Sequence, residues 1–308
     1  VQTRYEDPNQ VLDRIAAVGK DEFVPLMQEI YSQPVQEALI RKRIQDIKAQ
    51  GGIAAVSGTP VAAMRFGKAI AEAGADLFFV QATVVSTDHT GPAGQETLDL
   101  EALCRDMGVP VVIGNCVTYD VALQLMRAGA AGVMVGIGPG AACTSRGVLG
   151  VGIPQATAVA DCAAARADYE KESGRYVPIV ADGGIVTGGD ICKCIACGAD
   201  AVMIGSPIAR AEEAPGRGFH WGMATPSPVL PRGTRINVGN TGSIERILRG
   251  PAKLDDGTHN LLGCLKTSMG TLGAQTIKEM QQVEVVVAPS LLTEGKVYQK
   301  AQHLGMGK

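Results

Sequence analysis

A glycine-rich loop holds the residues whose types and spacing best suit chemistry. Residues 136–146 read Gly-Ile-Gly-Pro-Gly-Ala-Ala-Cys-Thr-Ser-Arg. The glycines allow the backbone to approach a ligand closely; carbonyl groups in such a loop suit a monovalent cation, and amide groups suit an anion. Cys143 stands where a nucleophile would, and the nearby positive charge of Arg146 favours its thiolate form. The alternative is an inert, packed cysteine, because one loop cysteine alone does not establish catalysis.

Two further turns have the composition of a nucleotide site. Asp182 precedes Gly183-Gly184, and Gly205-Ser206 ends the next apolar segment. An aspartate at a strand end is well placed to accept hydrogen bonds from ribose hydroxyl groups, and barrels often hold phosphate beside their last two strands. Each glycine-containing turn alone is explained by a tight bend of the chain. Two such turns at the ends of adjacent strands favour the binding of a nucleotide monophosphate.

The elements that must position these turns follow from a pattern that the chain repeats three times. At 73–80, 128–135 and 197–204, a helical stretch ends on a glycine and an apolar run of strand length follows. Glycine suits the left-handed position after a helix, and strands apolar on both faces indicate a parallel sheet covered by helices. The predicted strands are 53–57, 77–80, 111–115, 132–135, 177–182 and 201–204. The predicted helices between them are 61–73, 96–107, 119–128, 155–172 and 189–197.

Regular alternation of strands and helices indicates either a (β/α)8 barrel or a doubly wound sheet. A barrel needs eight strands, whereas six are predicted, and residues 1–50 are expected to form helices at 11–18, 22–30 and 36–49. We therefore expect an α/β chain that forms a (β/α)8 TIM barrel whose first two strands lie upstream of Val1. The alternative is an open six-stranded sheet.

The chain divides into four segments on this interpretation. Residues 1–50 form an N-terminal helical segment, and residues 51–210 supply barrel strands 3–8. Residues 211–260, rich in glycine, proline and arginine, are expected to be a flap or active-site loop, the alternative being a surface excursion. Residues 261–308 hold a helix at 261–272, a strand at 283–287 and a tail.

Composition limits the class of protein. The 308 residues are 46% hydrophobic and 19% charged with a net charge of −3, which excludes a disordered chain and argues against a nucleic-acid partner. No apolar run reaches the roughly 18 residues of a membrane span, and no secretory signal is recognisable. The 8 cysteines indicate reduced thiols and a cytoplasmic protein.

Together these motifs resemble the IMP dehydrogenase / GMP reductase family. The resemblance covers about residues 53–275, and its closest branch is the IMP dehydrogenase-related proteins without the regulatory CBS pair. The residues that carry it are 136–146, Gly150-Val151-Gly152-Ile153-Pro154-Gln155, Ala181-Asp182-Gly183-Gly184-Ile185, Val202-Met203-Ile204-Gly205-Ser206, Trp221-Gly222-Met223 and Gly242-Ser243-Ile244.

The resemblance implies an NAD-dependent enzyme of guanine nucleotide synthesis that oxidises IMP to XMP and assembles as a homotetramer or an octamer. Cys143 would attack C2 of the purine, hydride would leave for NAD⁺, and the thioimidate would be hydrolysed. The implied catalytic residues are Cys143, Ser145, Arg232 and Arg235. The implied potassium ligands are the carbonyl groups of Gly138, Gly140 and Cys143. The implied substrate contacts are Ala141, Asp182, Gly183, Gly184, Gly205, Ser206, His220, Gly222 and Met223. The implied cofactor contacts are Gln81, Ala82, Thr83, Asn115 and Gly136.

Several positions depart from the family pattern. Ala141 stands where a phosphate-binding serine is common, His220 stands near the usual tyrosine, and Gln81 replaces an aspartate. The usual Arg-Tyr pair of the flap has its nearest counterpart in 231–235. A GMP reductase that uses NADPH and a non-catalytic nucleotide-binding relative therefore stay as alternatives, although the long flap favours the dehydrogenase.

Overall fold

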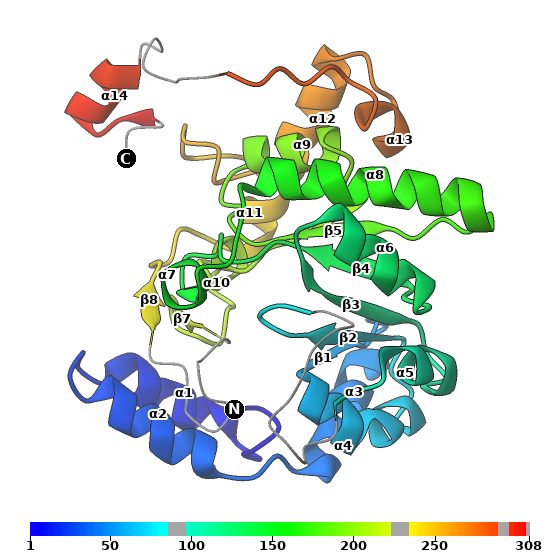
Figure 1. The fold of residues 1–308 in the computed structure, drawn as a ribbon. Coiled ribbons are helices and arrows are strands. Elements are labelled where there is room, and N and C mark those ends of the chain that lie inside the picture. The colour runs from blue at the N-terminus through cyan, green and yellow to red at the C-terminus, as the bar shows by residue number, and fades with distance from the viewer. Residues whose placement is uncertain (86–96, 223–233, 289–295, 306–308) are drawn as a thin grey trace.

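One curled parallel sheet forms the centre of the computed structural model, which describes residues 1–85, 97–222, 234–288 and 296–305 (Figure 1). Its six strands run in sequence order, each paired in parallel with the next. A doubly wound sheet reverses its strand order, whereas a barrel wall does not. The strands are β1 (Ala55–Gly58), β2 (Leu77–Gln81), β3 (Val111–Cys116), β4 (Gly132–Val135), β5 (Ile179–Asp182) and β6 (Ala201–Met203).

The curl brings distant strands together across the concave side. The side-chain amide of Gln81, at the end of β2, lies 3.7 Å from the sulfur of Met203 at the end of β6. A flat sheet would hold these strands several strand widths apart. The six predicted strands and their barrel arrangement are confirmed, and the two strands expected upstream of Val1 stay a prediction.

Helices follow the strands and cover the outer face of the sheet. They are α4 (Pro60–Glu72), α5 (Leu100–Asp106), α6 (Tyr119–Arg127), α8 (Gln155–Ser173) and α9 (Gly188–Ala196). Thr59 caps α4 ahead of a proline in its first turn, and Thr187 and Asp190 form a reciprocal capping box on α9. The repeated glycine has its predicted role at Gly129 and Gly198, whose φ angles are +97° and +109°.

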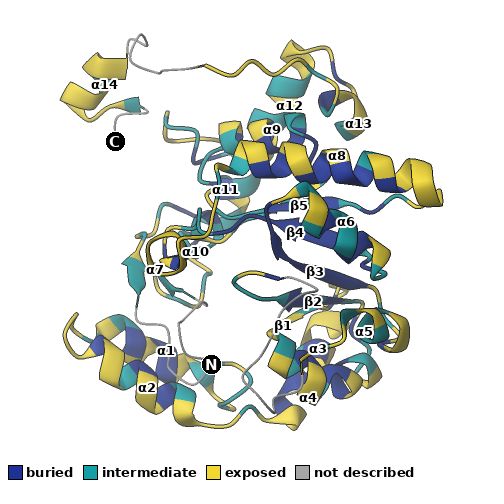
Figure 2. Ribbon diagram, viewed as in Figure 1, coloured by how far each residue is buried: buried dark blue, intermediate teal, exposed yellow. Residues whose placement is uncertain are grey.

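The core lies between the sheet and these helices. Strands β3 and β4 are buried along their whole length (Figure 2). Ile113 and Val133 from the sheet pack in one cluster with Leu125 and Met126 from α6. Burial of both strands on both faces is the arrangement that the continuous apolar runs predict.

The N-terminal helices are α1 (Pro8–Ala17), α2 (Phe23–Ser32) and α3 (Glu37–Ala49), close to the predicted ranges. Helix α3 adds Ile40 and Ile44 to the main core. Helices α1 and α2 instead form a second apolar cluster of their own, which includes Ile15 and Met27 and against which Trp221 packs. The α1–α2 pair is thus a separate packing unit.

The segments that follow β4 and β6 have more regular structure than the sequence indicated. Short helices α7 (Ser145–Leu149) and α10 (Ser206–Ala209) follow β4 and β6, and β7 (Phe219–Trp221) pairs antiparallel with β8 (Arg235–Asn237) inside the expected flap. The later helices are α11 (Ile244–Arg249), α12 (Leu261–Thr271), α13 (Ile277–Met280) and α14 (Lys296–Gln302).

The predicted strand at 283–287 is wrong. These residues are irregular, and Val286 and Val287 are 80% and 88% exposed. A valine run favours a strand only where a partner strand and a packed face are available, and the described part of the chain offers this segment neither. None of the described helices is long and apolar enough to cross a bilayer.

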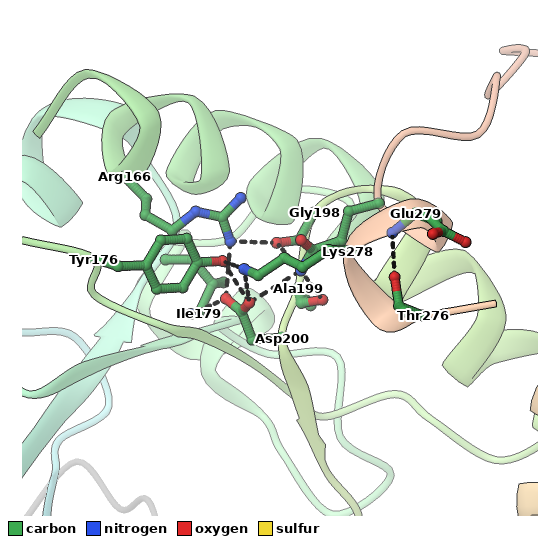
Figure 3. A network of polar contacts seen from close by, with 10 residues as sticks. Arg166, Tyr176, Ile179, Gly198, Ala199, Asp200, Thr276, Lys278 and Glu279 are labelled. Carbon is green, nitrogen blue, oxygen red and sulfur yellow. Dashed lines mark hydrogen bonds and ion pairs between the residues drawn. The ribbon is translucent and has the colours of Figure 1, made fainter. Parts of the chain in front are cut away.

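A network of polar contacts lies at the amino ends of β5 and β6, opposite the end that bears the glycine-rich loop. Figure 3 shows this network. Asp200, just before β6, accepts hydrogen bonds from the Arg166 guanidinium at 2.8 Å and from the Ile179 backbone N–H at 2.9 Å. Lys278 of α13 approaches the same carboxylate at 3.0 Å. One aspartate therefore ties α8, β5, β6 and the C-terminal helices together.

Candidate active site

The glycine-rich loop leaves the carboxyl end of β4 and presents Cys143 half-buried. The Cys143 backbone N–H donates to the Gly140 carbonyl at 3.0 Å, which closes a tight turn. Helix α7 begins immediately afterwards with Ser145, which is buried and whose hydroxyl lies 3.1 Å from the Cys143 sulfur. The structure thus brings the two predicted catalytic residues of this loop into hydrogen-bond contact.

Arg146 serves as the internal support of that loop. Its guanidinium donates to the carbonyl groups of Ile137 at 3.2 Å and Ile153 at 2.7 Å. A Cβ atom on Gly138 or Gly152 would lie 2.4 Å or 2.8 Å from the Arg146 side chain. Those glycines are required because the loop wraps around an arginine, a reason that the sequence interpretation did not include.

Asp182 ends β5 with its carboxylate turned toward β3. Asn115 of β3 donates to this carboxylate at 2.8 Å and to the Gly136 carbonyl at 2.9 Å. Burial raises the pKa of Asp182, and the hydrogen bond from Asn115 opposes that rise. The resemblance assigns Asn115 to the cofactor; its amide is occupied here in fixing the strand ends.

The turn after β5 packs directly on the cysteine loop. Gly183 and Gly184 both have positive φ, at +90° and +76°. Cβ atoms at these positions would lie 3.0 Å and 2.9 Å from the Pro139 ring. The two predicted turns are therefore neighbours, with glycine needed at the contact.

Ser206 and His220 form the third part of the site. The Ser206 hydroxyl, at the start of α10, lies 3.1 Å from His220 Nε2 on β7. Burial lowers the pKa of His220, which favours its neutral form. Gly222 comes directly after the end of β7, and a Cβ there would lie 2.8 Å from the Ala142 carbonyl. Gly205 and Ala141 are exposed beside these contacts.

The predicted cofactor turn lies at the end of β2. Gln81 accepts a hydrogen bond from the Ser57 hydroxyl at 2.7 Å. The Ala82 backbone joins β3 through its N–H to the Gly114 carbonyl at 2.8 Å, and Thr83 follows half-buried. This turn stands at the same edge of the sheet as Asn115, as parallel strand ends require.

Gln155 is a site-edge residue that the sequence interpretation missed. Its side-chain N–H donates to the Val135 carbonyl at 2.7 Å, and Nε2 lies 3.4 Å from the Asp182 carbonyl. A Cβ on Gly136 would lie 2.1 Å from that Asp182 carbonyl and 2.8 Å from Gln155 Oε1. Gln155 is part of the family motif at 150–155, but the sequence alone gave no reason to assign a function to its side chain.

A comparison with known protein families identifies the family of this chain. The model of the IMP dehydrogenase / GMP reductase domain matches residues 8–225, which is most of the chain. The chain belongs to the IMP dehydrogenase / GMP reductase family. As a member of this family the protein is an oxidoreductase.

Individual members of this family support the assignment. An uncharacterised oxidoreductase of Mycobacterium leprae is 42% identical over 269 residues, covering 86% of this chain and 72% of that protein. The inosine-5′-monophosphate dehydrogenase of Aquifex aeolicus is 36% identical over 231 residues, covering 70% of this chain and 45% of that protein.

Solved structures agree with the family assignment. The IMP dehydrogenase/GMP reductase-like protein of Corynebacterium glutamicum superposes with a TM-score of 0.85 at 36% identity, covering 93% of this chain and 76% of that one. The GMP reductase of Trypanosoma brucei, solved with guanosine 5′-triphosphate, gives a TM-score of 0.56 at 29% identity, covering 76% and 45%.

The two arginines predicted to be catalytic have different outcomes. Arg232, like the substrate residue Met223, lies outside the described residues. Arg235 donates to the carbonyl groups of Ile15 and Val18 and stacks on aromatic rings. These contacts do not support a catalytic role for Arg235. That role stays a prediction.

The family's potassium ion can be tested against the loop. Backbone carbonyl oxygens are suitable ligands for this ion, and Gly138 has the positive φ, +82°, of a loop that turns its carbonyl groups out of a regular ladder. The Gly140 carbonyl already accepts the Cys143 N–H, which occupies one of its two lone pairs. The carbonyl groups of Gly138, Gly140 and Cys143 are donors of the kind that suits the ion, and their role as its ligands stays a prediction.

Proposed function

We propose that this protein is an NAD-dependent IMP dehydrogenase that converts IMP to XMP. The observation that carries the proposal is the contact between two strand-end loops, in which Gly183-Gly184 pack on Pro139 of the loop that bears Cys143. This contact brings Cys143 and Asp182 onto adjoining turns, which supports their proposed roles as nucleophile and as ribose ligand. The family membership and the 36% identity to a named IMP dehydrogenase support the same reaction.

Cys143 performs the first chemical step, the attack on the purine. The Cys143 thiol loses its proton and the sulfur adds to C2 of the purine. NAD⁺, when bound, accepts the hydride that C2 must release to restore the double bond. The Ser145 hydroxyl, 3.1 Å from the sulfur, is positioned to donate a hydrogen bond to the thiolate.

Hydrolysis completes the turnover. Water adds to C2, the carbon–sulfur bond breaks, and the sulfur takes back a proton while the new oxygen stays on the purine as XMP. Asp182 would hold the ribose hydroxyl groups through its ionised carboxylate. Ser206 and His220, whose side chains are 3.1 Å apart, would hold the phosphate with the glycine turns.

A GMP reductase is the second candidate, because a GMP reductase structure matches 76% of this chain at a TM-score of 0.56. It would use the same cysteine in a reductive deamination with NADPH. The Mycobacterium leprae relative is an uncharacterised oxidoreductase, so its name favours neither reaction over the other.

One assay separates the candidates. The protein is incubated with IMP, NAD⁺ and K⁺, and NADH absorbance is followed beside a sample with GMP and NADPH. We expect NADH formation in the first sample only, and its loss in Cys143→Ala. Loss of NADPH in the second sample would favour the reductase, and turnover in neither would favour a nucleotide-binding protein without this activity.

A further inference from the structure

Strand β7 has two faces with different partners. Side chains alternate along a strand, so Phe219 and Trp221 point to one side and His220 to the other. His220 meets Ser206 in the candidate site. Trp221 packs instead against the α1–α2 pair. The strand therefore joins the N-terminal helices to the phosphate side of the site.

The contacts on the helical side are specific. The Trp221 indole N–H donates to the Tyr31 hydroxyl of α2 at 2.9 Å. Arg235, directly opposite Trp221 in the β7–β8 ladder, donates to the Ile15 carbonyl and, at 2.8 Å, to the Val18 carbonyl at the end of α1. A planar guanidinium is suited to such paired recognition.

Aromatic stacking reinforces the arginine. The Arg235 guanidinium carbon lies 4.8 Å from the centre of the Phe23 ring of α2 and 4.6 Å from that of Phe219. These distances are within the range of cation–π attraction. Arg235 thus bridges a ring on the helices and a ring on the hairpin while it binds the end of α1.

The residues next to the Trp221–Arg235 pair reach the loop that carries Cys143. The Gly222 N–H donates to the Thr234 carbonyl at 3.1 Å, which extends the β7–β8 ladder by one residue. Gly222 approaches the Ala142 carbonyl so closely that a Cβ would lie 2.8 Å from it. Ala142 is buried and precedes Cys143. A displacement of Trp221 would therefore be transmitted to the backbone beside the nucleophile.

We propose that the α1–α2 pair is a positioning element of the active site. It holds β7 through the Tyr31–Trp221 hydrogen bond and the Arg235 contacts, and β7 in turn fixes Gly222 against the loop that carries Cys143. Tyr31, Trp221 and Arg235 are positioning residues, since they act through Gly222. The consequence for IMP binding rests on the proposed function, whereas the link to Cys143 does not.

The decisive experiment needs no substrate. Tyr31→Phe removes one hydroxyl, and Tyr5→Phe is its matched control, because the Tyr5 hydroxyl binds the Ile30 carbonyl within the N-terminal helices at 3.2 Å. Iodoacetamide labelling of Cys143, followed by peptide mass spectrometry, measures how tightly the loop is held. We expect labelling about threefold faster in Tyr31→Phe, the effect of losing roughly one hydrogen bond, and no change in Tyr5→Phe. Equal labelling rates in both variants would overturn the proposal.

Fluorescence verifies that the effect begins at the indole. Trp221 is the single tryptophan of the chain, so acrylamide quenching reports on this contact alone. Quenching should increase in Tyr31→Phe and stay unchanged in Tyr5→Phe, with little change in melting temperature for either. Unaltered quenching in Tyr31→Phe would contradict the proposed link through the Tyr31–Trp221 hydrogen bond.

A double-mutant cycle tests the path. In a Trp221→Phe background the Tyr31→Phe change should have no further effect on Cys143 labelling, because the hydrogen bond is already absent. An effect of equal size in both backgrounds would exclude Trp221 as the link. For the dehydrogenase, Tyr31→Phe should lower kcat/KM for IMP by roughly fivefold, because both Gly222 and the Cys143 loop are held less firmly, whereas Tyr5→Phe should leave kcat/KM unchanged. An unchanged kcat/KM in Tyr31→Phe would refute the positioning of the site through Gly222, and absence of turnover in the unchanged protein would count against the proposed function only.

Discussion

Asn115 and Asp182 are joined by a 2.8 Å hydrogen bond although their strands, β3 and β5, are separated by β4. The Asn115 amide reaches over the end of β4, where it also binds the Gly136 carbonyl. One side chain therefore sets the relative position of the Asp182 carboxylate and the start of the loop that carries Cys143. This contact is the structural reason to treat the two turns as one site.

Substitution of Asp182 should separate stability from binding. Asp182→Asn keeps an acceptor for Asn115 but removes a carboxylate whose pKa is raised by burial. A raised pKa means that the ionised form destabilises the folded state at neutral pH. We expect Asp182→Asn to melt at a higher temperature at pH 7 and to lose this advantage as the pH falls through the folded pKa toward the ordinary value of 3.8. Thermal unfolding between pH 7 and pH 4 measures it.

The same variant should bind nucleotide poorly. Hydrogen bonds to charged groups contribute about 1.5–3 kcal/mol, so KM for IMP should rise at least roughly tenfold. Steady-state kinetics with IMP as the varied substrate give this value. An unchanged KM would show that ribose is bound elsewhere.

Removal of the Cys143 thiol should abolish turnover but leave IMP binding intact. Cys143→Ala should lower kcat by at least roughly a thousandfold, because the covalent step that we propose needs the Cys143 sulfur. Cys104→Ala is a suitable control, since Cys104 is also half-exposed and burial raises the pKa of its thiol to about 11. Calorimetric titration with IMP should give similar affinities for both variants. Residual turnover near the unchanged rate in Cys143→Ala would remove the covalent mechanism.

Replacement of K⁺ tests the carbonyl set of the loop. If the carbonyl groups of Gly138, Gly140 and Cys143 hold potassium, exchange of K⁺ for Li⁺ should slow turnover, because Li⁺ is too small for a set spaced for K⁺. Li⁺ and K⁺ titrations at constant ionic strength provide the comparison. A rate indifferent to the cation would exclude this site.

The local patterns predicted the βα units well, because each is fixed by neighbouring residues. Gly129 and Gly198 marked helix ends, and the apolar runs marked strands buried on both faces. The partners of side chains far apart in the chain could not be predicted. Arg235 looked like a catalytic candidate in a flap, yet it binds Ile15 and Val18, 220 and 217 residues earlier. Its environment depends on how α1 docks, which no local pattern records.

The Asp200 network should govern stability without affecting chemistry. Burial opposes ionisation of Asp200, but hydrogen bonds from Tyr176, the Ile179 N–H, Gln281 and Lys278 hold its pKa below the ordinary value of 3.8 (Figure 3). Its stabilising contribution is therefore present above that value and lost as the pH falls through the lower folded pKa.

Asp200→Asn leaves the Arg166 guanidinium, whose side chain is only 10% exposed, without its counter-charge. Loss of one partner from a buried pair costs about 3 kcal/mol, so unfolding in urea should begin at a clearly lower concentration. Asp106→Asn is the matched control, because its Arg105 pair is 65% and 64% exposed and contributes little. Asp200 lies at the amino end of β6, away from Cys143, so kcat per folded molecule should stay unchanged. A variant as stable as the control would mean that the packing around α13, rather than this charge pair, secures the C-terminal helices to the sheet.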